Sequence, residues 1–184
     1  MSEKDSKHLQ GEAAKGGQWK LTWKDAILYS FLGILFVGQV VLCFLFYNWA
    51  NLDVLLYMGW ATLAASQVLG MMSRAAFQTK GRAAEGASWL QTTVVVDSGI
   101  YSIVRHPMYL SGICLILALI LISQHWLSPI FGIPTIVFFY LSMPQEEQSN
   151  IQKFGNDYVA YMKRVPRMNL ILGIIRLLRR QKHS

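Results

Sequence analysis

The 184-residue sequence predicts an all-α protein with four transmembrane helices. Hydrophobic residues make up 53% of the chain and charged residues only 15%, which lies outside the usual range of soluble proteins. The apolar residues gather in four segments separated by polar turns and loops, and all 17 lysine and arginine residues lie outside these segments. Together these observations predict a polytopic membrane protein.

The first two apolar segments are each long enough to span a bilayer. Residues 26–50 and 54–72 rise by about 1.5 Å per residue if helical, which suits a hydrocarbon core of roughly 30 Å. A short polar turn at residues 51–53 separates them. The first segment starts too late in the chain and is too long for a cleavable signal peptide, so we expect none.

The third and fourth segments, residues 107–123 and 129–143, are shorter than a full span. The turn at residues 124–126 forces them to be antiparallel neighbours, so we expect a hairpin that crosses a thinned or tilted region. Residues 168–178 are apolar but too short to cross, and the arginines nearby favour a helix in the membrane interface. A fifth, short or re-entrant membrane helix is the alternative for this segment.

A mixed polar helix is predicted to follow the fourth segment. Pro144 suits its first turn, and Gly155 suits its C-cap. Asn156 or Asp157 suits the N-cap of the next helix, which continues to Arg164.

The basic residues predict the orientation in the membrane. They lie in the N-terminal tail, in the loop between the second and third segments and in the C-terminal part, and the two short turns contain none. The positive-inside rule therefore predicts an integral membrane protein with both termini and the middle loop in the cytoplasm. This explains the net charge of +7 by topology and by attraction to membrane lipids, and no nucleic-acid partner is expected.

Composition divides the chain into two parts. Residues 1–24, rich in Lys, Gly, Ser and Glu, predict a disordered cytoplasmic tail, and residues 25–184 predict one membrane domain. Cys43 and Cys114 both lie inside apolar segments, where a thiol behaves as a small hydrophobic group. We therefore expect neither a disulfide framework nor a bound metal.

The stretch SIVRHPMYLSG, residues 102–112, places charge at the start of the third segment. Pro107 suits the first turn of a helix, so the free N–H groups of that helix lie beside Arg105 and His106. This arrangement favours binding of a carboxylate or phosphate. Two simpler interpretations stay open here: Arg105 extends to lipid headgroups, and His106 caps the helix.

Acidic and aromatic residues approach the same boundary. The hairpin returns the chain to the cytoplasmic side, which brings Glu146 and Glu147 to the depth of Arg105 and His106. Carboxylates at a membrane boundary favour a bound cation, so the expected ligand carries both signs of charge, although glutamates in a first helical turn also stabilise its dipole. Tyr101, Tyr109, Tyr158 and Tyr161 can stack on a flat ring or face a cation, but for the last two we expect a role as interfacial anchors.

Residues 93–167 resemble a family of integral-membrane methyltransferases that includes isoprenylcysteine carboxyl methyltransferase and the phospholipid N-methyltransferases. The resemblance rests on GIYSIVRHPMYLSG, a following hairpin, and PQEEQSNIQKFGNDYVAYMKRVPR. It implies that residues 93–167 form the cofactor-binding part, with S-adenosylmethionine as methyl donor. It also implies a lipophilic small-molecule or lipidated acceptor at the cytoplasmic membrane face.

For the cofactor that the resemblance implies, charge and geometry suggest roles for individual residues. We expect the helix start at His106-Pro107 to bind the methionine carboxylate, Glu146 the ammonium group, and Tyr101 or Tyr109 the adenine or the sulfonium. His106 and Glu147 are candidate catalytic bases for an amine or thiol acceptor. The cofactor-binding residues that it implies are Val94, Val95, Val96, Tyr101, Arg105, His106, Pro107, Met108, Tyr109 and Glu146.

Two positions depart from the pattern of the isoprenylcysteine enzymes. Those enzymes carry a histidine-containing tetrad before the GxY turn, where this chain has Thr93-Val94-Val95-Val96. They also carry an arginine linked to the substrate carboxylate, where this chain has Ser142. Phospholipid, small amine and thiol acceptors therefore stay open beside a carboxyl acceptor. Pro134 and Gly132 can bend the fourth segment and open a path from the bilayer.

Two other classes of function are also open. The membrane sterol reductases carry a related HPxY arrangement, and Arg74, Lys80 and Arg82 can meet the extra phosphate of a nicotinamide cofactor. The third possibility is a membrane scaffold without enzymatic activity, whose charges only set the topology.

Overall fold

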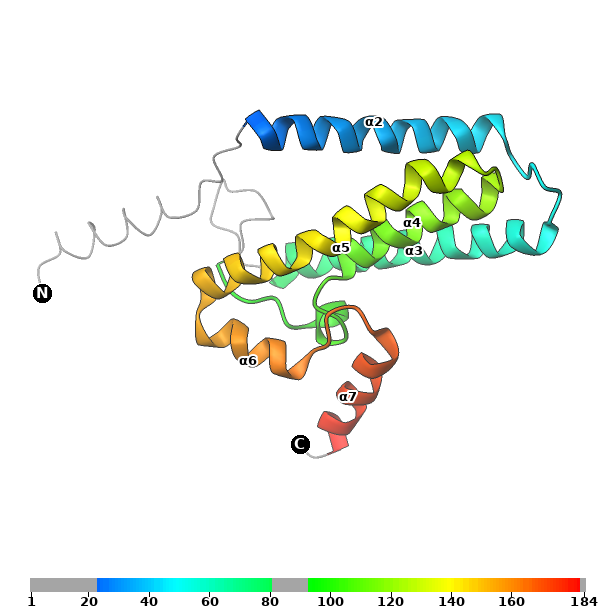
Figure 1. Cartoon of the computed structure of the whole chain (residues 1–184). Coiled ribbons are helices and arrows are strands. Elements are labelled where there is room, and N and C mark those ends of the chain that lie inside the picture. Colours follow the sequence, from blue (N-terminus) through cyan, green and yellow to red (C-terminus); the bar gives the residue numbers. More distant parts are fainter. Residues whose placement is uncertain (1–22, 81–92, 183–184) are drawn as a thin grey trace, which may run out of the picture. The chain divides into compact units, whose positions relative to one another are not determined.

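A computed structural model describes residues 23–80 and 93–182 of the chain. Within these residues every regular element is a helix (Figure 1). The long helices are α2 (Trp23–Leu45), α3 (Asp53–Lys80), α4 (Pro107–Ser123) and α5 (Leu127–Phe154). The shorter elements are the 3₁₀ helix η1 (Gly99–Ser102), α6 (Asn156–Arg164) and α7 (Leu170–Lys182). The predicted disordered tail is residues 1–24. Residues 1–22 lie outside the described residues, and Trp23 and Lys24 are already part of α2.

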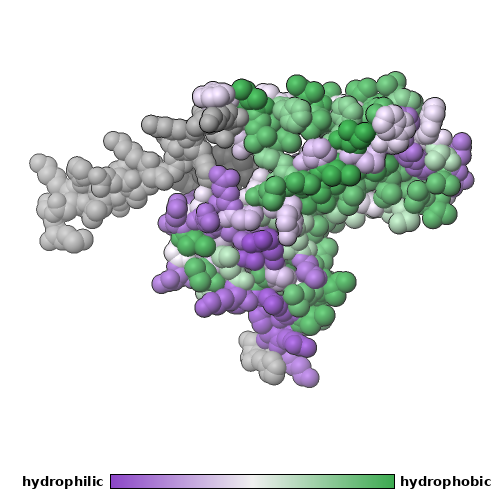
Figure 2. Space-filling view, in the orientation of Figure 1, coloured by the Kyte–Doolittle hydropathy of each residue, from purple (hydrophilic) through white to green (hydrophobic). Residues whose placement is uncertain are grey.

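The long helices have the length and composition of membrane spans. Residues Ala26–Leu45 of α2, together with α3 and α5, are each long and apolar enough to cross a membrane, and α4 is a shorter apolar helix of 17 residues. Large apolar side chains such as Phe44, Val54 and Leu141 are exposed along these helices, as expected for surfaces that face lipid. Figure 2 shows hydrophobic residues gathered over the long helices and hydrophilic residues over the α6 and α7 region.

The α3 and α4 helices pack closely in antiparallel order because small residues face each other. Gly59 lies against Ile122, and eleven residues later Gly70 lies against Ser111. The hydroxyl groups of Ser66 and Ser111 each donate to the backbone carbonyl of the other residue at 2.9 Å. Small residues and reciprocal polar contacts are typical of helix pairs in membranes.

The α4 and α5 helices form the predicted antiparallel hairpin. Gly112 of α4 lies against Phe139 of α5, and Gly132 of α5 lies against Ile116 and Ile120. Gln124, in the turn, has φ 54° and bonds with its side chain to both the N–H and the carbonyl of Leu52. The two polar turns therefore lie together at one end of the bundle.

Part of α2 joins this bundle through a buried polar contact. The Gln39 amide donates to the Ser128 hydroxyl at 2.6 Å, and both residues are fully buried. Gly38 lies against Phe131 in the same region. A polar side chain facing a partner helix, rather than lipid, is the usual arrangement within a bilayer.

Several predicted boundaries are wrong. The first helix ends at Leu45 instead of residue 50, and the second extends to Lys80 instead of residue 72. No new helix begins at Pro144, because α5 continues through Pro134 and Pro144 to Phe154. A proline removes one intrahelical hydrogen bond, but a helix that stays packed on its neighbours tolerates this loss.

Gly155 ends α5 as predicted, with its N–H bonded to the Ile151 carbonyl at 2.8 Å. It also occupies the N-cap position of α6, which the sequence analysis had assigned to Asn156 or Asp157. Its φ of 58° explains this, since glycine adopts such a backbone conformation without strain.

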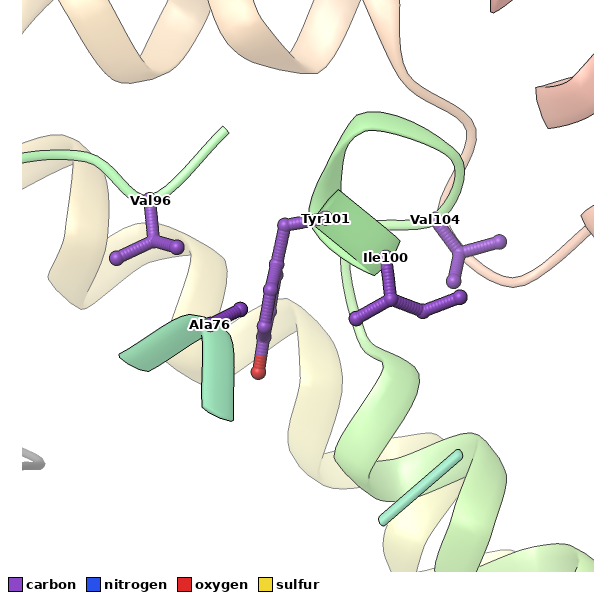
Figure 3. Close-up of a cluster of buried hydrophobic side chains, with 5 residues drawn as sticks. All are labelled: Ala76, Val96, Ile100, Tyr101 and Val104. Atoms are coloured by element: carbon purple, nitrogen blue, oxygen red, sulfur yellow. The ribbon is translucent and has the colours of Figure 1, made fainter. Parts of the chain in front are cut away.

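The segment from Val95 to His106 packs onto the end of α3 that lies away from the polar turns. Ala76 of α3 belongs to one buried cluster with Val96, Ile100, Tyr101 and Val104. Figure 3 shows the Tyr101 ring beside Ala76, with Val96 on one side and Ile100 and Val104 on the other. A second cluster joins Tyr158, Tyr161 and Val165 to Val95. These two clusters hold the residues of the candidate site in place.

Candidate active site

A cavity of about 480 Å³ lies between the Val95–His106 segment, the start of α4, the second half of α5, and α6. Eight of the ten predicted cofactor-binding residues line it: Val95, Val96, Tyr101, Arg105, His106, Met108, Tyr109 and Glu146. Val94 and Pro107 are not among the lining residues. The residues that the sequence analysis did not assign to it are Phe77, Phe139, Asn150, Lys153, Phe154, Tyr158 and Tyr161.

Backbone contacts fix the segment that carries most of these residues. The N–H groups of Arg105 and His106 donate to the carbonyls of Pro166 and Arg167 at 3.0 and 3.2 Å. The Tyr161 hydroxyl donates to the Tyr101 carbonyl at 2.8 Å. The chain that follows α6 therefore runs beside the chain that precedes α4 and holds it.

Glu147 is the centre of a buried ionic cluster. Its Oε1 lies 3.1 Å from His106 Nε2 and 3.0 Å from Arg105 Nη1. Arg167 binds both carboxylate oxygens, with Nη2 2.5 Å from Oε2 and Nε 3.1 Å from Oε1. Two guanidinium groups thus face one carboxylate, so the cluster carries a net positive charge when His106 is neutral.

Arg105 keeps one donor that no group in the described part of the chain satisfies. Its side chain is only 10% exposed, and its Nη1 pairs with Glu147, but its Nε is buried without a hydrogen-bond partner. The side chain turns inward to Glu147, so the alternative that Arg105 extends to lipid headgroups is wrong. A buried donor without a partner costs free energy, so Arg105 favours an anionic ligand in the cavity that it lines.

His106 occupies the N-cap position of α4, but its side chain makes no capping hydrogen bond. Burial lowers the pKa of His106 below its ordinary value of 6.5, against the opposing effects of Glu146 and Glu147. The ring is therefore neutral at neutral pH. A carboxylate only accepts, so Nε2 carries the proton and donates it to Glu147, and Nδ1 is left as an acceptor.

Glu146 supplies the opposite charge in the same cavity. Its side chain is 42% exposed, and its Oε1 lies 4.0 Å from His106 Nδ1. The predicted meeting of Glu146 with the start of α4 is confirmed. The cavity therefore has an acidic side chain and the guanidinium of Arg105, with its unsatisfied Nε, in its lining, as a ligand of both signs requires.

Aromatic rings form much of the remaining wall. Tyr109 makes edge contacts with His106 and Phe139, with ring centroids 5.5 and 5.9 Å apart. Burial raises the pKa of Tyr101, Tyr158 and Tyr161, so their hydroxyl groups stay neutral. The expectation that Tyr158 and Tyr161 are interfacial anchors is wrong, because both are buried and line the cavity.

Asn150, Lys153 and Arg167 also belong to the site, although the sequence motifs assign them no role. Asn150 and Lys153 lie four and seven residues after Glu146 on α5, so helical spacing places all three residues on the same face of this helix. Arg167 is the last residue of the VPR sequence, and its contact with Glu147 joins two segments twenty residues apart. The helical spacing from Glu146 could therefore have predicted Asn150 and Lys153 in the site. No periodicity in the sequence could have predicted the contact of Arg167 with Glu147.

The comparisons with known proteins agree with this geometry. Residues 54–157 match the family model of the phospholipid methyltransferases, which covers more than half of the chain. The matched range includes most of α3, all of α4 and α5, and the cavity-lining residues from Phe77 to Phe154. The comparisons with curated proteins and with solved structures gave no match.

Proposed function

Because the chain belongs to the phospholipid methyltransferase family of membrane methyltransferases, we propose that it uses S-adenosylmethionine as methyl donor. The proposed acceptor is lipophilic and reacts at the cytoplasmic membrane face. The observation that carries this proposal is the presence of Arg105 donors and the Glu146 carboxylate in the lining of one cavity.

The residues of the cavity fit this cofactor. A volume of about 480 Å³ falls in the range of small-molecule sites, about 300–1,000 Å³. Arg105 and the first N–H groups of α4 suit the methionine carboxylate, and Glu146 suits the ammonium group. The rings of Tyr109, Phe139 and Tyr158 suit adenine. When bound, the cofactor supplies an electrophilic methyl group on a sulfonium.

His106 is the proposed proton acceptor. Its Nδ1 is unprotonated at neutral pH, and it belongs to a side chain that lines the cavity. Glu147 accepts from Nε2 and so keeps the ring in this tautomer, as the carboxylate partner of a histidine base does. Since Glu147 is already held by Arg105 and Arg167, His106 is the better candidate for the base.

A base at His106 favours some classes of methyl acceptor over others. An amine or thiol must lose a proton when it gains a methyl group, whereas a carboxylate has none to lose. In addition, Ser142 replaces the arginine that the isoprenylcysteine enzymes use for a carboxylate, and its hydroxyl donates to the Phe138 carbonyl within α5. A lipophilic amine or thiol, including a phospholipid amine, is therefore favoured over a carboxyl acceptor.

Family membership disfavours the two other classes of function. Arg74 and Lys80, expected to meet a nicotinamide cofactor in a reductase, do not line the cavity, and Arg82 lies outside the described residues. A scaffold without activity gives no reason for an unsatisfied Arg105 Nε in a side chain that lines a cavity of this size.

Binding and transfer test the proposal in turn. Purified full-length protein in nanodiscs is titrated with S-adenosylhomocysteine and with reduced nicotinamide dinucleotide phosphate, and heat is measured. We expect binding of the first compound only. Binding of the second alone would support a reductase, and binding of neither would leave the scaffold.

The acceptor is then identified by transfer of a labelled methyl group. Extracted lipids, lipophilic amines, thiols and prenylated peptides are offered to the protein separately. We expect label in an amine or thiol, and label confined to the carboxyl group of prenylated peptides would overturn that assignment.

A further inference from the structure

The helix α7 (Leu170–Lys182) carries an apolar face that the described part of the chain does not cover. Ile171 and Leu178 are 75% and 58% exposed, and Ile174 and Ile175 are exposed between them. At 100° per residue these four residues lie on one face of the helix. Exposed apolar residues gathered in this way require a partner.

The charges of α7 indicate which partner fits. Arg179 lies beside the apolar face and Lys182 at its C-terminal end, and LILGIIRLLRRQK contains no acidic residue. An apolar face with basic flanks suits the surface of an anionic membrane. Figure 1 shows α7 running across the direction of α3, α4 and α5. This direction suits a helix in the membrane interface more than a further membrane span.

The opposite face of α7 packs on the segment that builds the cavity. Gly173 is buried against the backbone carbonyl of Ile103, and a Cβ at this position would collide with it. Arg180 Nη2 donates to the Ser102 carbonyl at 3.1 Å. Ser102 and Ile103 directly precede Arg105 and His106, which line the cavity.

We propose that α7 binds the anionic lipid surface of the membrane and thereby holds the Gly99–His106 segment in its ligand-binding arrangement. Lipid contacts on the outer face fix α7 in the interface. Gly173 and Arg180 on the inner face contact Ile103 and Ser102, so a fixed α7 restricts the movement of the chain before α4. The site then binds cofactor more tightly on anionic membranes. This inference rests on the proposed function for its ligand.

Hydrogen exchange tests the lipid contact without using any ligand. Full-length protein is placed in nanodiscs of phosphatidylcholine, with or without phosphatidylserine, and exchange of the α7 amides is followed. We expect slower exchange with phosphatidylserine, and Arg179→Gln should reduce this protection about fivefold. Equal exchange in the two nanodiscs would overturn the proposal.

A pair of variants on the same helix identifies the face involved. Ile171→Ser combined with Ile175→Ser removes apolar contact from the outer face without changing the charge, and should abolish the added protection. Gln181→Ser, also exposed on α7 but outside the four-residue apolar face, should retain it. Equal loss in both would contradict an apolar lipid contact.

Cofactor-product binding tests the coupling. S-adenosylhomocysteine should bind several-fold more tightly in nanodiscs with phosphatidylserine than without it. Gly173→Ala should keep the lipid-dependent protection of α7 but lose this gain in affinity, because its Cβ pushes α7 away from Ile103. Arg180→Gln removes the hydrogen bond to Ser102, one to the Arg176 carbonyl within α7 and one positive charge, and it should lose part of the gain with less risk of misfolding than Gly173→Ala.

The outcomes separate this inference from the proposed function. If S-adenosylhomocysteine binds equally well in both nanodiscs, the coupling is wrong and the proposed cofactor stands. If it binds in neither nanodisc, the proposed cofactor is wrong, and the exchange data alone decide whether α7 contacts lipid.

Discussion

Glu147 and Glu146 are neighbours in the chain but have different surroundings. Glu147 is almost fully buried among Arg105, His106 and Arg167, whereas Glu146 is partly exposed in the cavity. Removing one partner of a buried ionic cluster leaves uncompensated charge in a low dielectric, which is costly. Glu147 is therefore expected to serve the fold and the position of His106, and Glu146 the ligand.

Substitution of the two glutamates should separate these roles. Glu147→Gln leaves two guanidinium groups without a counter-charge and should lower the free energy of unfolding by about 3 kcal/mol. Glu146→Gln should leave stability nearly unchanged. Chemical denaturation in detergent micelles, followed by circular dichroism, measures both. Equal losses would mean that the buried cluster does not stabilise the fold.

In nanodiscs of phosphatidylcholine alone, where α7 meets no anionic lipid, ligand affinity should respond to the cavity wall and not to the last residues of α7. Glu146→Gln removes the proposed partner of the ligand ammonium group and should weaken S-adenosylhomocysteine binding by about tenfold or more. Tyr109→Ala removes an aromatic wall and should weaken it as well. Lys182→Ala is the control, and calorimetry on all three proteins gives the comparison. An equal effect of all three substitutions would place the site elsewhere.

Activity should fall in acid because His106 must be neutral to accept a proton. Burial lowers the pKa of His106 below 6.5, so methyl transfer should be constant above pH 6.5 and decline as pH falls through the lowered pKa. The unfolded chain binds this proton more readily than the folded protein, so the stability contribution of His106 is also present above pH 6.5 and lost below it. Rates and unfolding curves from pH 5 to 8 check both statements. His106→Gln should remove the acid limb from whatever activity it retains.

Close packing of α3 on α4 positions the start of α4, and it depends on small residues at the contact. A Cβ on Gly59 would lie 2.7 Å from Ile122 Cγ1 and 3.1 Å from the Ile122 backbone nitrogen. The backbone of α4 cannot move away without disturbing its last carbonyls, at residues 122 and 123, which accept hydrogen bonds from the N–H groups of residues 48 and 49. Helix separation at this contact is thus set by glycine.

A larger residue at this contact should force the two helices apart. Gly59→Leu should lower the free energy of unfolding by about 1–3 kcal/mol, the usual cost of overpacking. Ala65→Leu, at an exposed position of the same helix, should have little effect. Thermal unfolding of both variants in the same detergent makes the comparison, and a stable Gly59→Leu protein would show that the contact is loose.

The molecule places its two ends in different surroundings. The two polar turns, at residues 51–53 and 124–126, lie at one end without a basic residue, and Arg105, Lys153 and Arg167 lie at the other. The positive-inside rule predicts that the second end, with the candidate site, faces the cytoplasm. The family shows a membrane methyltransferase, and the side of the membrane is a prediction.

Reporter fusions test this orientation. Green fluorescent protein joined to either terminus should fluoresce in a bacterial host, because it folds in the cytoplasm. Alkaline phosphatase inserted at residues 124–126 should be active, since that turn is expected on the other side. Active phosphatase at either terminus would reverse the predicted topology.

Local sequence was sufficient to predict the helices, the hairpin and the start of α4, because apolar length, turn residues and Pro107 act on the backbone nearby. It was also sufficient to predict that Glu146 lies near Arg105 and His106, because a hairpin of two segments of similar length returns the chain to the same depth in the membrane. It failed at Pro144, where packing of α5 on its neighbours outweighs the local preference of a proline for a helix start.

The partner of each charge depends on contacts between distant segments, and no periodicity reports these contacts. Arg167 reaches Glu147 because the chain after α6 runs beside the chain before α4. Tyr158 and Tyr161 are buried in the cavity wall instead of the membrane interface for the same reason. Burial, the tautomer of His106 and the unsatisfied Nε of Arg105 all follow from that juxtaposition, since a side chain's solvation and hydrogen bonds depend on the groups that folding brings beside it.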